Sequence, residues 1–181
     1  MMVSAMHNVR TTPAIAAIGI AATAPISPKS DGQLVEQLEH TLKGIATMRD
    51  SRFSGIGILV YRRGSLSDEN HSDLRPSASC PEDISLGTKG CIEELLRISG
   101  SDNKLHDGFI FFDDTGRMTH VSQYFSPQIV KNLAINENFG GRFRAAQYGS
   151  LLRGVIAIGI VEHDGECFVF SNGITVRVQV P

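Results

Sequence analysis

An acidic segment of this sequence carries side chains that could act on a hydroxyl group. His106, Asp107 and Gly108 stand directly before the apolar run Phe109-Ile110-Phe111-Phe112. A carboxylate at the start of a strand can accept a hydroxyl proton, and the adjacent glycine leaves room for a ligand beside the backbone. Taken alone, Asp107 can equally cap a turn, and His106 can be a surface histidine instead of a metal ligand.

A basic segment follows later in the chain, with the sequence Gly140-Gly141-Arg142-Phe143-Arg144. Paired glycines can adopt positive φ and expose their N–H groups, and the first N–H groups of a helix favour an anion. Two guanidinium groups at such a point could clamp phosphate oxygens. An exposed basic turn explains the same residues equally well when the segment is considered by itself.

Glu162 is a third candidate, because it ends the fully apolar run 155–161. A carboxylate at the carboxyl end of a strand in an α/β sheet commonly faces the ligand crevice and could help to hold a divalent ion. It could also be a solvated acid at a strand end. Together with the two segments above, it suggests a site for a phosphorylated ligand and a metal ion.

The elements that must position these residues follow from the hydrophobic pattern. Apolar residues recur at three- and four-residue steps over 31–50, where Asp31 is a candidate N-cap, and over 87–99. Continuous or alternating apolar runs predict strands, and a short helix is expected at 142–149. The predicted strands span residues 55–61, 108–112, 117–124, 155–161, 166–170 and 174–180.

These elements predict an α/β fold, with one domain over residues 31–181 in which helices flank a central mixed β-sheet. Residues 62–83 are rich in Ser, Asp, Asn and Pro and predict a surface loop insertion. Residues 1–30 form an apolar or flexible N-terminal segment. Its apolar run, 13–26, is shorter than the roughly 20 residues that cross a bilayer, so no membrane span is expected.

The composition of the chain limits the kinds of partner and the cellular compartment that we expect for this protein. With 181 residues, 41% of them hydrophobic, the chain is long enough for one well-buried core. A net charge of -2 supplies no field to attract DNA or RNA, so a nucleic-acid polymer is not an expected partner. The three cysteines form no Cys-x-x-Cys pair, which favours a reducing compartment and a cytoplasmic protein over secretion.

In their order and spacing, three segments resemble the diadenylate cyclase domain, found at the N-terminus of DNA-integrity-scanning proteins and in membrane-linked bacterial cyclases. That family carries Leu-His-Asp-Gly-Ala, then Gly-Thr-Arg-His-Arg-x-Ala, then an apolar strand ending in Val-Ser-Glu. The matching segments here are 105–109, 140–146 and 159–162, and the likeness runs from roughly Gln33 to Gly173.

The resemblance implies a seven-stranded mixed sheet and the condensation of two ATP molecules into cyclic di-AMP with release of pyrophosphate. It implies a face-to-face homodimer and a divalent metal, Mg²⁺ or Mn²⁺. By position, Asp107, Gly108, Arg142 and Arg144 would be catalytic, and His106 and Glu162 would hold the metal. Nucleotide contacts would come from Gly108, Phe109, Tyr124, Gly140, Gly141, Arg142 and Arg144.

Four positions depart from the family pattern. Phe109 replaces Ala, Gly141 replaces Thr, Phe143 replaces His, and Val161 replaces Ser. Because the acid and both arginines remain, the first hypothesis is a diadenylate cyclase. The alternative is a nucleotide-binding sensor domain without turnover, and a third option is a scaffold that only assembles with a partner.

Overall fold

The structure is a computed structural model that describes residues 27–131, 133 and 139–180. It contains a β-sheet, three α-helices and a short 3₁₀ helix in these residues. The strands are β1 Ile56–Tyr61, β2 His71–Asp73, β3 Phe109–Phe112, β4 Met118–Phe125, β5 Val155–Val161, β6 Cys167–Ser171 and β7 Ile174–Val178. The helices are α1 Asp31–Met48, α2 Lys89–Ile98, α3 Gly141–Gly149 and the 3₁₀ helix η1 Asp68–Asn70.

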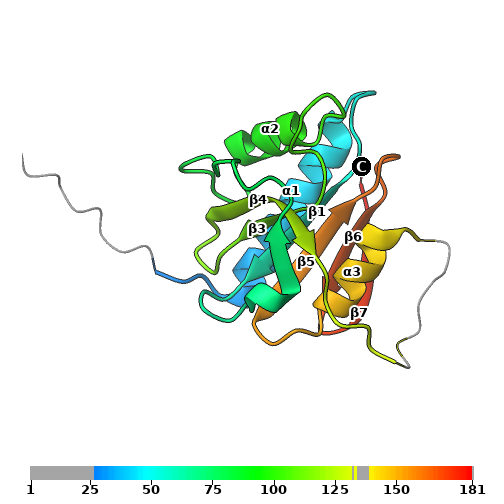
Figure 1. Cartoon of the computed structure of the whole chain (residues 1–181). Helices are drawn as coiled ribbons and strands as arrows, with labels where there is room; N and C mark the ends of the chain where they lie inside the picture. The colour runs from blue at the N-terminus through cyan, green and yellow to red at the C-terminus, as the bar shows by residue number, and fades with distance from the viewer. Residues whose placement is uncertain (1–26, 132, 134–138, 181) are drawn as a thin grey trace, which may run out of the picture.

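The seven strands form one mixed sheet in the order β2-β4-β3-β1-β5-β6-β7 (Figure 1). β1 and β3 are parallel, with Gly57 opposite Phe109, whereas β1 and β5 are antiparallel, with Ile56 opposite Val161. The first residues of β1 and β3 and the last residues of β5 therefore lie at the same end of these three adjacent strands. This topology brings the residues just before β3 close to those just after β5.

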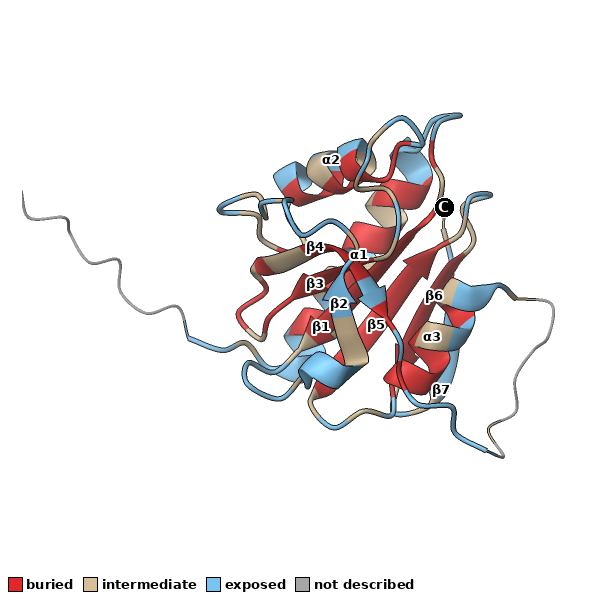
Figure 2. Ribbon diagram, in the orientation of Figure 1, coloured by how far each residue is buried: buried red, intermediate tan, exposed pale blue. Residues whose placement is uncertain are grey.

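The helices cover both faces of the sheet. Helices α1 and α2 pack on one face, in a cluster that contains strand side chains such as Ile58 and Phe112. Helix α3 packs on the other face, against an aromatic cluster that includes Phe111 and Phe170. Figure 1 shows α3 and α1 on opposite sides of the strands, and Figure 2 shows the buried strands between them.

Helix α1 anchors one layer because its apolar residues share a face. Leu34, Leu38, Leu42 and Ile45 are each fully buried. Complete burial of one such side chain contributes about 1.5–3 kcal/mol, so this face outweighs the weak stability of an isolated helix of 18 residues.

The predicted α/β fold is confirmed, with two corrections in detail. The N-cap of α1 is Ser30 and not Asp31, because the Ser30 hydroxyl accepts a hydrogen bond from the Gln33 N–H and Gln33 completes a capping box. The predicted loop 62–83 contains η1 and the edge strand β2, whose three residues are too few to give a periodic signal.

The described residues contain no helix that is both long and apolar enough to cross a membrane. The apolar run at 13–26, and with it most of the predicted N-terminal segment 1–30, lies outside the described residues.

Candidate active site

The acidic segment lies in the turn that leads into β3. Gly108 has φ +84, and a Cβ there would sit 2.4 Å from the carbonyl oxygen of Gln123 in β4. Position 108 therefore requires glycine because the backbone of β4 approaches it closely. The space that a Cβ would take is filled by the backbone of β4, and the room for a ligand beside this glycine stays a prediction.

His106 and Asp107 are in contact with each other before β3. The His106 Nε2 and Asp107 Oδ1 atoms are 3.3 Å apart, and the Asp107 side chain is 57% exposed. The other ring nitrogen of His106, Nδ1, lies 2.6 Å from the carbonyl oxygen of Asn103. The carboxylate is thus accessible from solution, while the imidazole is held by the turn behind it.

The basic segment forms the start of α3. Gly140 is the N-cap residue with φ -74, so the positive φ that the paired glycines suggested does not occur there. Among the residues that the structure describes, no atom lies within 4 Å of a Cβ placed at Gly140 or Gly141. Side chains therefore do not crowd these two glycines, and the first N–H groups of α3 could donate hydrogen bonds to an anion.

Arg142 interacts with two acidic residues of the site, Glu162 and Asp107. Its guanidinium packs against Gly55, where a Cβ would sit 2.8 Å from Nη1. Burial lowers the pKa of Arg142, and the charges of Glu162 and Asp107 act against this decrease. Burial raises the pKa of Glu162, and the charge of Arg142 opposes that rise. Arg142 thus interacts electrostatically with both predicted acids.

A groove of about 450 Å³ connects the two segments. Gly108 and Phe109 border it on the side of β3, and Tyr124 borders it from β4. On the side of α3 it is bordered by Gly141, Arg142 and Arg144. Its size suits a small-molecule ligand, and its lining includes both predicted arginines.

Both aromatic residues that depart from the expected pattern have a structural explanation. Phe109 is 4% exposed and packs edge-to-face on Phe125, with ring centroids 5.3 Å apart. Phe143 is also 4% exposed and stacks on Phe139 at 3.9 Å, with Phe170 against its edge. Phe143 therefore belongs to the packing beneath α3, and Phe109 closes the floor of the groove.

The donor atoms of His106 and Asp107 fit a divalent cation. Two atoms 3.3 Å apart can both bind one ion, whose bonds to nitrogen and oxygen are about 2.1 Å long. In the part of the chain that the structure describes, no group of three or more His, Cys, Asp or Glu side chains could hold a metal ion. The residues thus suit an ion whose other ligands are phosphate oxygens and water, and the role predicted for Glu162 as a ligand stays a prediction.

No protein-family model matches the sequence, and no curated protein matches it. Solved structures do match. A double mutant of DacA from Staphylococcus aureus superposes with a TM-score of 0.56 and 20% identity, over 82% of this chain and 88% of that one. The chain has a DacA-like fold.

A second match supports the DacA-like fold. A hypothetical membrane spanning protein from Bacillus cereus gives a TM-score of 0.58 at 18% identity. The match covers 84% of the present chain and 65% of the Bacillus cereus chain. At such low identities these likenesses concern the path of the backbone and not the activity.

The structure therefore brings Gly108, Phe109, Tyr124, Gly141, Arg142 and Arg144 to one groove. It places Asp107 and Glu162 within electrostatic reach of Arg142, and Gly140 directly before α3. Sequence reasoning missed Asn103, which contacts His106, and it did not assign Gly55, which contacts Arg142, to the site. Gly55 gave a weak signal, since a glycine before an apolar strand indicates close approach of another group.

Proposed function

We propose that this protein is a diadenylate cyclase, which condenses two ATP molecules into cyclic di-AMP and releases two molecules of pyrophosphate. The observation that carries the proposal is that two arginines, Arg142 and Arg144, line one groove of about 450 Å³, and that the exposed carboxylate of Asp107 interacts electrostatically with Arg142. The DacA-like fold is compatible with this reaction.

In the proposed reaction the 3′-hydroxyl oxygen of one nucleotide forms a bond to the α-phosphorus of the other. The bond from that phosphorus to the pyrophosphate oxygen breaks. Asp107 orients the hydroxyl and accepts its proton, for which an exposed carboxylate directly before the groove residue Gly108 is suited. Arg142 and Arg144 neutralise the charge that develops on the phosphate oxygens, and this requires positioned donors more than a covalent intermediate.

A divalent cation held by His106 and Asp107 supplies further neutralisation of phosphate charge when it is bound. The residues of the chain bind and orient the nucleotide around it. Tyr124 lies at the rim of the groove with 55% of its surface exposed, a position from which its ring can contact a base.

A homodimer is part of the proposal because each hydroxyl must reach the phosphate of a second nucleotide. One groove of this size holds a single nucleotide, so two grooves must face one another. In that arrangement the exposed rim residues Tyr124 and Ile129 lie near the second copy.

The deciding experiment incubates the purified chain with ATP and either Mg²⁺ or Mn²⁺ and detects cyclic di-AMP by mass spectrometry. Asp107→Asn, which keeps the size of the side chain and removes its basicity, should abolish the product. Asp164→Asn, in the turn after Glu162, is a control outside the groove and should retain activity. A wild-type protein that binds ATP and yields no product with either metal contradicts the proposal.

A nucleotide sensor with the same fold is the second candidate. Gly141 favours this candidate, because it lines the groove at a position where the family pattern has threonine, and it therefore lacks the threonine hydroxyl group. A sensor predicts that ATP raises the melting temperature through preferential binding to the native state, with no turnover. If no nucleotide shifts the melting temperature, the sensor hypothesis is wrong.

A further inference from the structure

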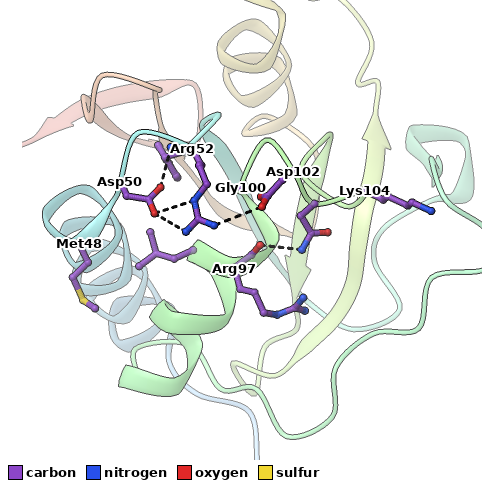
Figure 3. A pocket seen from close by; sticks show the side chains of 10 residues that line it. Met48, Asp50, Arg52, Arg97, Gly100, Asp102 and Lys104 are labelled. Carbon is purple, nitrogen blue, oxygen red and sulfur yellow. Dashed lines mark hydrogen bonds and ion pairs between the residues drawn. The ribbon is translucent and has the colours of Figure 1, made fainter.

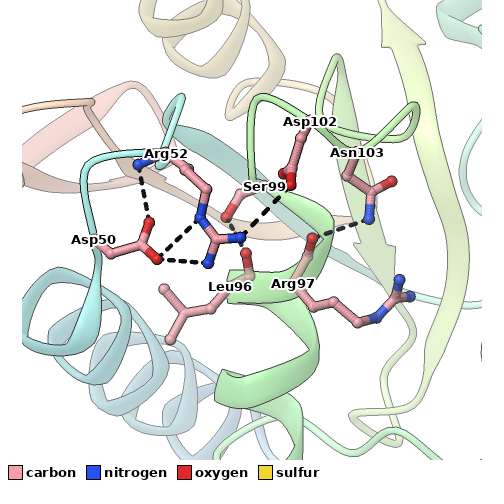
Figure 4. A network of polar contacts seen from close by, with 7 residues as sticks. All are labelled: Asp50, Arg52, Leu96, Arg97, Ser99, Asp102 and Asn103. Atoms are coloured by element: carbon pink, nitrogen blue, oxygen red, sulfur yellow. Dashed lines mark hydrogen bonds and ion pairs between the residues drawn. The ribbon is translucent and has the colours of Figure 1, made fainter.

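Asn103 lies in the turn between α2 and β3 and is fixed by three hydrogen bonds. Its side-chain Nδ2 donates to the Arg97 carbonyl oxygen at 2.9 Å, as Figure 4 shows. Its Oδ1 accepts from the Leu105 N–H at 2.9 Å, and its own N–H donates to the Gly100 carbonyl at 2.8 Å. The side chain also satisfies a carbonyl at the end of α2 that the helix leaves unpaired.

The turn is anchored from the α1 side as well. The Ser101 N–H donates to the Arg52 carbonyl at 2.8 Å, and the Arg52 guanidinium lies 3.5 Å from an oxygen of Asp102. These contacts border a hollow of about 690 Å³ between the ends of α1 and α2 (Figure 3). The turn that contains Asn103 is therefore held both by α2 and by the segment that follows α1.

The carbonyl oxygen of Asn103 determines which nitrogen of His106 carries the proton. It lies 2.6 Å from His106 Nδ1 and also accepts the His106 backbone N–H at 3.2 Å. A carbonyl can only accept, so an unprotonated Nδ1 at this distance would place two lone pairs against each other. The short contact requires the proton on Nδ1.

The opposite nitrogen, Nε2, faces the carboxylate. Its distance to Asp107 Oδ1 is 3.3 Å, which exceeds the usual range of an N–H···O hydrogen bond, whereas the Nδ1 contact lies at the short end of that range. In neutral His106 the single ring proton therefore stays on Nδ1. Nε2 then carries its lone pair at an atom 3.3 Å from the carboxylate oxygen, a separation at which one metal ion can bind both atoms.

We infer that Asn103 is a positioning residue for the divalent metal ion that accompanies the nucleotide. It holds His106 in the tautomer whose Nε2 can bind a metal ion. The inference rests on the proposed function only for the identity of the ligand that brings the cation. Hydrogen bonding of one ring nitrogen is the general way in which proteins orient a metal-binding histidine.

The test is nitrogen NMR of the full chain without nucleotide or metal, at a pH about two units above the usual imidazole pKa of about 6.5. The ring-nitrogen chemical shifts of His106 should show a protonated Nδ1 and an unprotonated Nε2. Asn103→Ala removes both hydrogen bonds of the Asn103 side chain. It should lower the ratio of the Nδ1–H to the Nε2–H tautomer of His106 by roughly fivefold, which corresponds to the free energy of about one hydrogen bond. Asn103→Ser is a second variant in case the alanine form does not fold.

Ser101→Ala is the matched control, because it alters the same turn at an exposed side chain and should leave the ratio unchanged. Added Mn²⁺ alone should broaden the His106 Nε2 resonance at lower concentration in the wild type than in Asn103→Ala. A wild-type spectrum with the proton on Nε2, or an unchanged ratio in both Asn103 variants, overturns the inference. Absence of cyclic di-AMP alongside a protonated Nδ1 would reject the proposed function and leave this inference in place.

Discussion

The Arg142 guanidinium lies against Gly55, so that a Cβ at position 55 would sit 2.8 Å from Nη1 and 3.2 Å from the Val161 carbonyl oxygen. Gly55 has φ +87 and directly precedes β1, whereas Arg142 lies in the first turn of α3. Gly55 is far from Arg142 in the sequence, and its missing side chain leaves the space that the Arg142 guanidinium occupies in the candidate site.

We therefore expect Gly55→Ala to weaken ATP binding by roughly tenfold or more, since a displaced guanidinium loses a charge-assisted hydrogen bond to phosphate. Gly64→Ala is the matched control. Gly64 also has a positive φ, +74, but a Cβ there would meet no atom within 4 Å. Both variants should lose about 1–2 kcal/mol to backbone strain, measured by urea denaturation, and only the first should lose affinity in calorimetry. Equal affinity in the two variants would contradict a role for Gly55.

Arg142 and Arg144 should differ in how well lysine replaces them. Arg142 is half-buried and lies near two carboxylates, whereas Arg144 is exposed. Lysine has one compact charge and loses it more readily on burial, so Arg142→Lys should weaken ATP binding by about tenfold and Arg144→Lys by only about twofold. Titration calorimetry measures both constants, and equal losses would mean that burial does not distinguish the two arginines.

Substitutions at Phe143 should lower the free energy of unfolding, whereas a substitution at Tyr124 should lower nucleotide affinity. Phe143 is buried in the aromatic packing beneath α3, so Phe143→Ala should cost about 3–5 kcal/mol of unfolding free energy. Phe143→His, which restores the residue of the family pattern, should also destabilise the protein, because it buries a polar ring among aromatic side chains. Tyr124→Ala, at an exposed position, should leave the urea midpoint nearly unchanged and reduce nucleotide affinity. The prediction is wrong if Phe143→His is as stable as the wild type.

Acid should weaken the packing of the edge strand β2. Burial lowers the pKa of His120, and the charge of His71 lowers it further, while Asp73 and Asp68 act in the opposite direction. The two imidazole ring centroids are 5.6 Å apart. Since the folded-state pKa lies below that of the unfolded chain, the unfolded state binds more protons in acid.

The stabilising contribution of neutral His120 is therefore complete above the unfolded pKa of about 6.5, and it is lost as the pH falls through the lower folded pKa. His120→Gln should flatten the fall in unfolding free energy below this pH in urea titrations. His40→Gln, at an exposed position on α1, should retain the fall seen in the wild type. Parallel curves for wild type and His120→Gln would show that another group carries the acid sensitivity.

The strongly periodic parts of the fold were predictable from sequence. The helix of Leu34, Leu38 and Leu42 follows from three- and four-residue spacing, and the strand of residues 155–161 from a continuous apolar run. Ser30 was missed as a cap because Asp31 beside it is an equally good capping type, and the choice depends on backbone dihedral angles. Strand β2 was missed because its pairing with β4, and not its own composition, makes it a strand.

Sequence by itself determined the residue types of the candidate site, since a carboxylate, an imidazole and two guanidinium groups have the same chemistry in any fold. Tertiary structure decided their relationships. The parallel pairing of β1 with β3 and the antiparallel pairing of β1 with β5 bring Asp107 and Glu162 to the same end of the sheet. The packing of α3 on the sheet then places Arg142 within electrostatic reach of both acids. Likewise, only packing decided that Phe143 turns toward Phe139 and Phe170 and away from the groove, because burial depends on neighbours that are distant in sequence.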